Sequence, residues 1–233
     1  MNENTLVAIC GYSGDAHLIR KFMPFHEQHE CPIVVLSPMD APVTKLRKHI
    51  CRQAGLRAYI GQASLTRQIE YFKILLEYPH DFYLINDSDS FCASAQIPQE
   101  WRRGGVWVNR VTDPRTHESK YPRYAFQPPY HCTREHLQNF IDVAHLCPAH
   151  PITPYVDHFM VQLIYEAGLD HVAFTELEHP APAGVLPFVG ADPWKQLEYR
   201  IKYHGAVAMH PIKNLSQSAL IKRARRFYEL THT

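Results

Sequence analysis

Short apolar runs alternate with longer amphipathic segments over the first 90 residues, and this alternation restricts the possible folds most strongly. Apolar runs at 6–10, 32–36 and 81–86 are typical of buried strands, and a shorter one is expected at 57–60. Helical spacing of apolar residues predicts helices at 17–29, 43–55 and 64–78. Strands that alternate with helices favour an α/β fold, in which helices cover both faces of a mostly parallel central sheet.

The second half of the chain is less regular. We expect strands at 104–109 and 205–210, helices at 133–145 and 156–168, and a long loop at 176–194 that is rich in proline and glycine. No linker or repeat divides the chain. The sequence therefore predicts one Rossmann-like domain over 1–215, followed by a basic amphipathic helix over 216–233 that packs on the domain or extends from it.

Composition excludes several classes of protein. The 233 residues are 45% hydrophobic and 20% charged with a net charge of +1, which gives no overall attraction to nucleic acid or membranes. The six cysteines have no CxxC spacing, so we interpret them as reduced thiols. No signal-peptide pattern and no apolar run of about 20 residues occurs, so we expect a cytoplasmic protein without a membrane segment.

An acidic triplet carries the strongest chemical signal. Asp87, Ser88 and Asp89 directly follow the apolar run at 81–86. Two carboxylates at positions i and i+2 of such a turn can converge on Mg²⁺ or Mn²⁺, which prefer oxygen ligands and keep positions open for phosphate groups. Such a cation stabilises a departing diphosphate. The alternative is a solvated turn whose aspartates cap the next segment.

A histidine near the C-terminus is the predicted third metal ligand. His210 follows the apolar run at 205–209, and an imidazole nitrogen there can bind the same cation. Lys213 lies close behind it and is predicted to meet the diphosphate. The alternative is a packed histidine, because the chain contains 16 of them.

Polar side chains after the first two strands predict a nucleotide pocket. In parallel sheets ligands bind at the carboxyl ends of the strands. Two basic residues of the helix at 64–78 are expected to point at the diphosphate, with a solvated helix face as the alternative. The predicted nucleotide-binding residues, besides Asp87, Ser88 and Lys213, are Gly11, Tyr12, Ser13, Asp15, Ser37, Asp40, Arg67 and Lys73.

The triplet and its preceding strand resemble the DxD motif of the GT-A fold glycosyltransferases, a superfamily that uses nucleotide-diphosphate sugars. Gly104 and Gly105 are similar to the glycine loop that follows the motif. The resemblance implies a GT-A-like domain, a Mn²⁺ or Mg²⁺ cofactor, and a C-terminal histidine ligand that matches His210. It also implies a catalytic base that matches Asp157, for which a carboxylate favourable at a helix N-terminus is the alternative interpretation.

The resemblance leaves the acceptor open: a glycan, a small molecule or a modified DNA base. The predicted acceptor-binding residues are Tyr130, Asp192 and Trp194. One alternative is a sugar nucleotidyltransferase, but the loop after the first strand lacks the basic residues typical of that class. A phosphatase is disfavoured because its aspartate normally follows the first strand. A third alternative is a non-catalytic module that binds a nucleotide sugar, or nucleic acid through the basic C-terminal helix.

Overall fold

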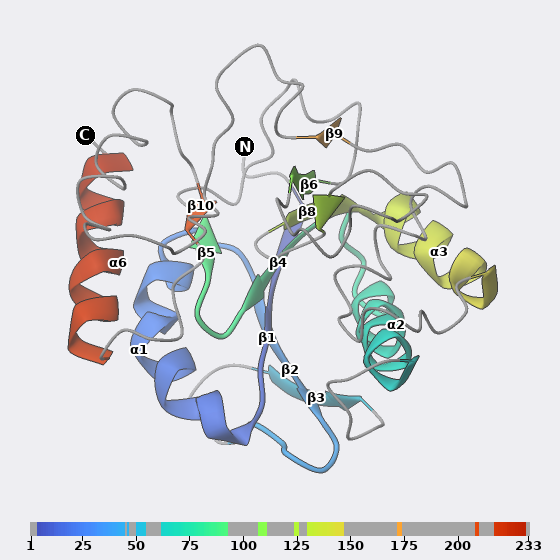
Figure 1. Cartoon of the computed structure of the whole chain (residues 1–233), viewed down its shortest axis with the longest axis horizontal. Helices are drawn as coiled ribbons and strands as arrows, with labels where there is room; N and C mark the ends of the chain where they lie inside the picture. Colours follow the sequence, from blue (N-terminus) through green and yellow to red (C-terminus); the bar gives the residue numbers. More distant parts are fainter. Residues whose placement is uncertain are drawn as a thin grey trace.

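A five-stranded sheet forms the centre of the protein (Figure 1). The computed structural model describes residues 4–44, 46, 50–54, 62–92, 107–110, 124–125, 130–146, 172–173, 208–209 and 217–231. The strand order is β3-β2-β1-β4-β8. These strands are β1 (Thr5–Cys10), β2 (Ile33–Pro38), β3 (Ile50–Ala54), β4 (Phe82–Asp87) and β8 (Tyr130–Thr133). The first four are parallel and β8 runs antiparallel to β4, which confirms the predicted α/β class with a mostly parallel sheet.

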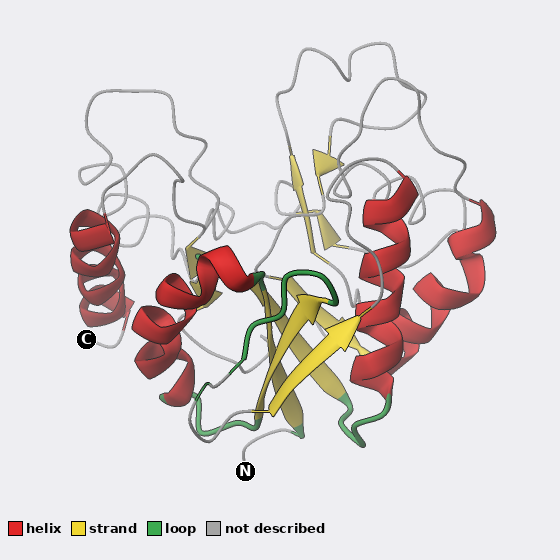
Figure 2. Ribbon diagram, turned by 90° about the horizontal axis from the view of Figure 1, so that it is seen from below, coloured by secondary structure: helices red, strands yellow, loops and turns green. Residues whose placement is uncertain are grey.

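Helices cover the sheet on opposite sides (Figures 1 and 2). On one side lie α1 (Ala16–Glu27) and α6 (Gln217–Thr231), and on the other lie α2 (Gln62–Leu76) and α3 (Arg134–Val143). Crossovers between parallel strands are almost always right-handed. The chain moves outward from β1 to β2 through α1 and returns across the sheet from β3 to β4 through α2, so the two helices take opposite faces.

The central strands are buried on both faces, which explains their nearly continuous apolar sequences. The core beneath α1 joins Val7 and Leu84 of the sheet to Ile19 and Met23 of the helix. On the other face, Phe72 of α2 and Phe140 of α3 pack with ring centroids 5.5 Å apart.

Two smaller sheets complete the described structure. One pairs β5 (Phe91–Cys92) antiparallel with β10 (Ala208–Met209). In the other, β6 (Trp107–Arg110) lies between β7 (Tyr124–Ala125) and β9 (Val172–Ala173). Strands are therefore present in both of the segments where they were expected, near 104–109 and 205–210.

The basic C-terminal helix packs against α1. Phe25 and Tyr228 face each other with ring centroids 6.2 Å apart, while Lys222, Arg225 and Arg226 are exposed. None of the helices in the described ranges is long and apolar enough to cross a bilayer.

One local prediction was wrong, and one strand was not predicted. The helix expected at 43–55 is contradicted because Ile50–Ala54 forms β3, which pairs in parallel with β2. Apolar spacing cannot separate short helices from strands, and pairing with the edge of β2 satisfies backbone groups along this segment. The strand β8 was missed, since Tyr130–Thr133 is short and follows two prolines. The strand expected at 57–60, the helix at 156–168 and the loop at 176–194 lie outside the described residues.

Arg134 closes the C-terminal end of α2, and its removal should destabilise the protein. Its guanidinium donates hydrogen bonds to the carbonyl oxygens of Leu76 (2.7 Å) and Tyr78 (2.9 Å) and to the Tyr83 hydroxyl (3.0 Å). We expect Arg134→Ala to lower the free energy of unfolding by about 1–2 kcal/mol, measured by urea denaturation. Arg134→Lys should recover only part of the loss, because an ammonium group lacks the planar fork. Wild-type stability in Arg134→Ala would contradict this assignment.

Candidate functional site

The carboxyl ends of β1 and β4 form the most favourable ligand position in this topology. The chain runs from β1 to β2 and β3 on one side, and β4 lies on the other side, so the strand order reverses between β1 and β4. Open parallel sheets bind ligands outside such a switch point. Cys10, the last residue of β1, is the register partner of Asp87, the last residue of β4. The acidic triplet therefore begins at the switch point.

Hydrogen bonds within the turn hold the acidic triplet in place. The Asp87 amide donates to the Ser90 hydroxyl (2.8 Å), and the Ser90 amide donates to the Asp87 carbonyl oxygen (3.2 Å). Ser88 and Asp89 are each only 6% exposed, and Ser90 is fully buried. The alternative of a solvated surface turn is therefore wrong, because this turn is packed into the protein.

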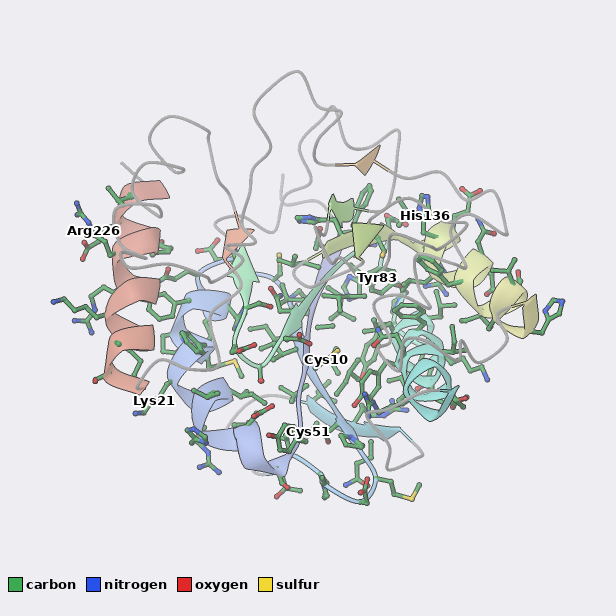
Figure 3. The ribbon with its side chains drawn as sticks, viewed as in Figure 1. Cys10, Lys21, Cys51, Tyr83, His136 and Arg226 are labelled. Atoms are coloured by element: carbon green, nitrogen blue, oxygen red, sulfur yellow. The ribbon has the colours of Figure 1, made fainter. Side chains whose placement is uncertain are left out.

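Arg67 of α2 lies on the same face of the sheet as the Asp87 side chain. The alternative of a solvated helix face is also wrong here, since Arg67 is 6% exposed. Desolvation and then the negative charge of Asp87 raise the pKa of the Cys10 thiol, while Arg67 lowers it. The charges of Asp87 and Arg67 therefore both act on the Cys10 thiol, which is labelled near the centre of Figure 3.

Hydrogen bonds connect the three loops that were expected to share this edge. The Gly11 amide donates to the Leu36 carbonyl oxygen (3.0 Å), and the Ser13 amide donates to the Ala41 carbonyl oxygen (2.8 Å). The Ser88 hydroxyl donates to a carboxylate oxygen of Asp15 across 73 positions of sequence, at 2.8 Å. The loops after β1, β2 and β4 thus form one connected rim.

The residues predicted to bind nucleotide differ in their accessibility. Tyr12 is 38% exposed, and Ser13 and Asp40 are also exposed. Ser37 is fully buried, and its hydroxyl accepts from the Val43 amide (3.0 Å), so this serine shapes the loop from inside. Tyr12, Ser13 and Asp40 therefore remain the accessible candidates in these two loops.

Lys73 is not brought to the acidic turn. It lies in the last turn of α2, and its ammonium group donates to the Glu70 carboxylate at 2.8 Å. That end of α2 is held by Arg134 near Tyr83 in the first half of β4, away from the carboxyl end of that strand. Arg67, six residues earlier in α2, is the basic residue of this helix that interacts near the turn.

Backbone pairing brings two further segments toward the turn. Met209 pairs with Phe91, two positions after Asp89, and Tyr130 pairs with Ile85, two positions before Asp87. Within the described ranges, no group of three or more histidine, cysteine or acidic residues is placed to hold a metal ion. The remaining predicted site residues lie outside the described residues: Asp157, Asp192, Trp194, His210 and Lys213.

Three features of the site escaped sequence analysis. The structural role of Ser90 and the bond between Asp15 and Ser88 give no recognisable sequence pattern. The third feature is Asn86, which is fully buried, and neither its amide nitrogen nor its oxygen has a hydrogen-bond partner among the described residues. An asparagine within an apolar strand was the available signal, because burying an unsatisfied polar group costs free energy.

Gly11 leaves little room beside the acidic turn, so a methyl group there should disturb it. A Cβ at this position would lie 2.8 Å from the Ile19 Cδ1 atom and 3.2 Å from the Ser88 Cβ atom. We expect Gly11→Ala to weaken Mn²⁺ binding about tenfold, measured by titration calorimetry, because overpacking shifts neighbouring groups. Gly14→Ala is the comparison in the same loop: its methyl group would meet the Tyr12 ring first, so we expect a smaller effect on Mn²⁺ affinity than in Gly11→Ala. Equal effects of both variants on Mn²⁺ affinity would contradict the expectation.

Comparisons with known proteins find likeness in structure and none in sequence. No protein-family model matches the chain, and no curated protein sequence matches it. One of the solved structures that the chain resembles is the crystal structure of galactosyltransferase LgtC in complex with donor and acceptor sugar analogs. The two are 14% identical, the TM-score is 0.49, and the match covers 97% of this chain and 95% of the other.

Proposed function

We propose that this protein is a metal-dependent glycosyltransferase that moves a sugar from a nucleotide-diphosphate donor to an acceptor hydroxyl. The observation that carries the proposal is the packed acidic turn at the switch point, with Asp87 at the end of β4 and Arg67 buried on the same face. The two carboxylates suit a divalent metal ion, and the buried guanidinium of Arg67 beside them suits a diphosphate.

The donor set fits Mn²⁺ or Mg²⁺. Asp87 and Asp89 supply carboxylate oxygens from one rigid turn, and His210 is the proposed third ligand. Its chain neighbour Met209 is paired with Phe91, which supports this choice. A bound cation would supply charge neutralisation for the diphosphate, as the acidic pair by itself would repel it.

The rim loops are proposed to hold the nucleotide. The exposed Tyr12 ring offers a face for stacking on a base, and Ser13 and Asp40 offer hydrogen-bonding groups nearby. Gly11 lets this loop lie close to the acidic turn, because a Cβ there would meet Ile19 and Ser88. Arg67 and Lys213 are proposed to bind the diphosphate from two different parts of the chain.

The acceptor side is proposed to involve Asp157 as the base, with Tyr130, Asp192 and Trp194 around the acceptor. We expect Asp157→Asn to lower the turnover rate about 100-fold and to leave donor binding unchanged, because a positioned base contributes at least that factor. Asparagine preserves size and most of the capping ability of aspartate. Normal turnover in Asp157→Asn, together with a lowered melting temperature in Asp157→Ala, would instead assign Asp157 to helix capping.

A thermal-shift experiment tests the proposed donor. Nucleoside diphosphates and their sugar conjugates should raise the melting temperature with Mn²⁺ and much less with EDTA, because only a ligand of the folded state stabilises it. Equal shifts under both conditions would remove the metal from the proposal. Binding without turnover would favour a non-catalytic module, and formation of sugar nucleotides from a nucleoside triphosphate would favour a nucleotidyltransferase.

A further inference from the structure

Asp15 occupies a position that its predicted role in nucleotide binding does not explain. It ends the short helix η1 (Ser13–Asp15) and precedes α1, yet its carboxylate makes no capping hydrogen bond to α1. Instead, one of its oxygens accepts a hydrogen bond from the Ser88 hydroxyl at 2.8 Å. The Asp15 carboxylate therefore joins two loops that lie 73 positions apart in the sequence, and it does not cap the helix that follows it.

Ser88 is the residue through which Asp15 can act on the metal site. It is the middle residue of the acidic triplet, and it is 6% exposed. Ser90 fixes the turn from within through two hydrogen bonds with the Asp87 backbone. The bond to Asp15 fixes the same turn from the neighbouring loop. Any rotation of the backbone at Ser88 changes the separation of the Asp87 and Asp89 carboxylates, so the bond constrains how both face a cation.

The loop that carries Asp15 also carries the exposed ring of Tyr12. The Asp15 amide donates to the Tyr12 carbonyl oxygen at 2.9 Å, and the Ser13 amide is anchored to Ala41. Gly11, at the start of the loop, lies near the turn, since a Cβ there would be 3.2 Å from the Ser88 Cβ atom. The hydrogen bond between Asp15 and Ser88 therefore transmits movement of the loop to the acidic turn.

We propose that Asp15 is a positioning residue that sets the geometry of the metal-binding turn through Ser88 and couples metal binding to occupancy of the nucleotide loop. This inference rests on the proposed function and changes the role of Asp15 within it. A charge-assisted hydrogen bond is stronger than a neutral one. Asp15→Asn retains an acceptor oxygen but loses the charge, so its effect should lie between wild type and Asp15→Ala.

The test is a double-mutant cycle on Mn²⁺ affinity, measured by titration calorimetry without nucleotide. We expect Asp15→Ala and Ser88→Ala each to weaken Mn²⁺ binding about tenfold, and the double variant to be no weaker than either single variant, because both delete one interaction. Asp142→Ala is the matched control: it deletes a carboxylate that also accepts a 2.8 Å hydrogen bond, from Gln138 on the surface of α3. This control should bind Mn²⁺ as wild type does.

Two other results separate this inference from the proposed function. If Asp15 contacts the base directly, Asp15→Ala will weaken binding of a nucleoside diphosphate in EDTA and leave Mn²⁺ affinity unchanged, which overturns the positioning role. Hydrogen exchange of residues 87–90 gives a readout that needs no metal. Faster exchange in both single variants would show that Asp15 controls the turn, whether or not the protein binds metal. If the wild type then bound no Mn²⁺, the metal-dependent function would be rejected and the role of Asp15 in the turn would stand. Unchanged exchange and unchanged affinity would overturn the inference.

Discussion

Replacing Asp89 by alanine is expected to lower glycosyl transfer about 1,000-fold or more. The carboxylate is one of two in the described structure that are proposed to hold the cation, and a bound metal supplies several kcal/mol of transition-state stabilisation. Each 1.36 kcal/mol corresponds to a factor of ten in rate. The measurement is the initial rate of transfer at saturating Mn²⁺, together with the Mn²⁺ affinity of the variant.

The burial of Asp89 makes a second variant necessary. A side chain that is 6% exposed contributes to packing, so alanine also leaves a small cavity in the turn. Asp89→Asn keeps the shape and replaces the charged ligand by a neutral amide. We expect the same loss of Mn²⁺ binding in Asp89→Asn, with a melting temperature close to wild type. Full activity in Asp89→Asn would remove Asp89 from the metal site.

Mild acid is expected to destabilise the protein strongly because two histidines are buried in the neutral form. Burial, and secondarily the charge of His29, lowers the pKa of both His26 and His131 from the ordinary 6.5 to about 3. Between pH 6.5 and 3 both histidines are therefore protonated in the unfolded chain and neutral in the folded state. Stability is fully present above about pH 6.5 and falls as the pH drops through this window.

The size of the effect follows from proton linkage. At pH 5 each histidine should lower the free energy of unfolding by about 2 kcal/mol relative to pH 7.5. The two together should therefore lower it by about 4 kcal/mol. Urea denaturation at both pH values measures this difference. His26→Leu should reduce the difference by about half, and His17→Leu, on the exposed side of α1, is the control for the substitution itself. A pH difference in His26→Leu equal to that of wild type would refute the assignment.

The strands and the acidic turn could be predicted because their signals are local. The runs that became β1, β2 and β4 are apolar on both faces, and the polar residues that follow them mark the carboxyl edge. In a parallel sheet the carboxyl ends of all strands lie at the same edge. The sequence therefore predicts that the loops after β1, β2 and β4 lie together.

The rest depends on contacts between distant segments. The sequence of β3 predicts a helix because its strand identity comes from pairing with β2, and β8 is defined by pairing with β4. The burial of Arg67 depends on how α2 lies on the sheet, and the bond between Asp15 and Ser88 joins loops 73 positions apart. Spacing within one segment carries no information about such contacts.

Release of nucleoside diphosphate from sugar donors tests the central claim most directly. The full chain should be incubated with a panel of nucleotide-diphosphate sugars, first with Mn²⁺ and then with excess EDTA, and the free nucleoside diphosphate measured over time. This reaction proceeds with water and needs no known acceptor. The account predicts release from at least one donor with Mn²⁺, and loss of that release in EDTA and in Asp89→Asn. No release from any donor, or release that chelation leaves unchanged, would contradict a metal-dependent glycosyltransferase.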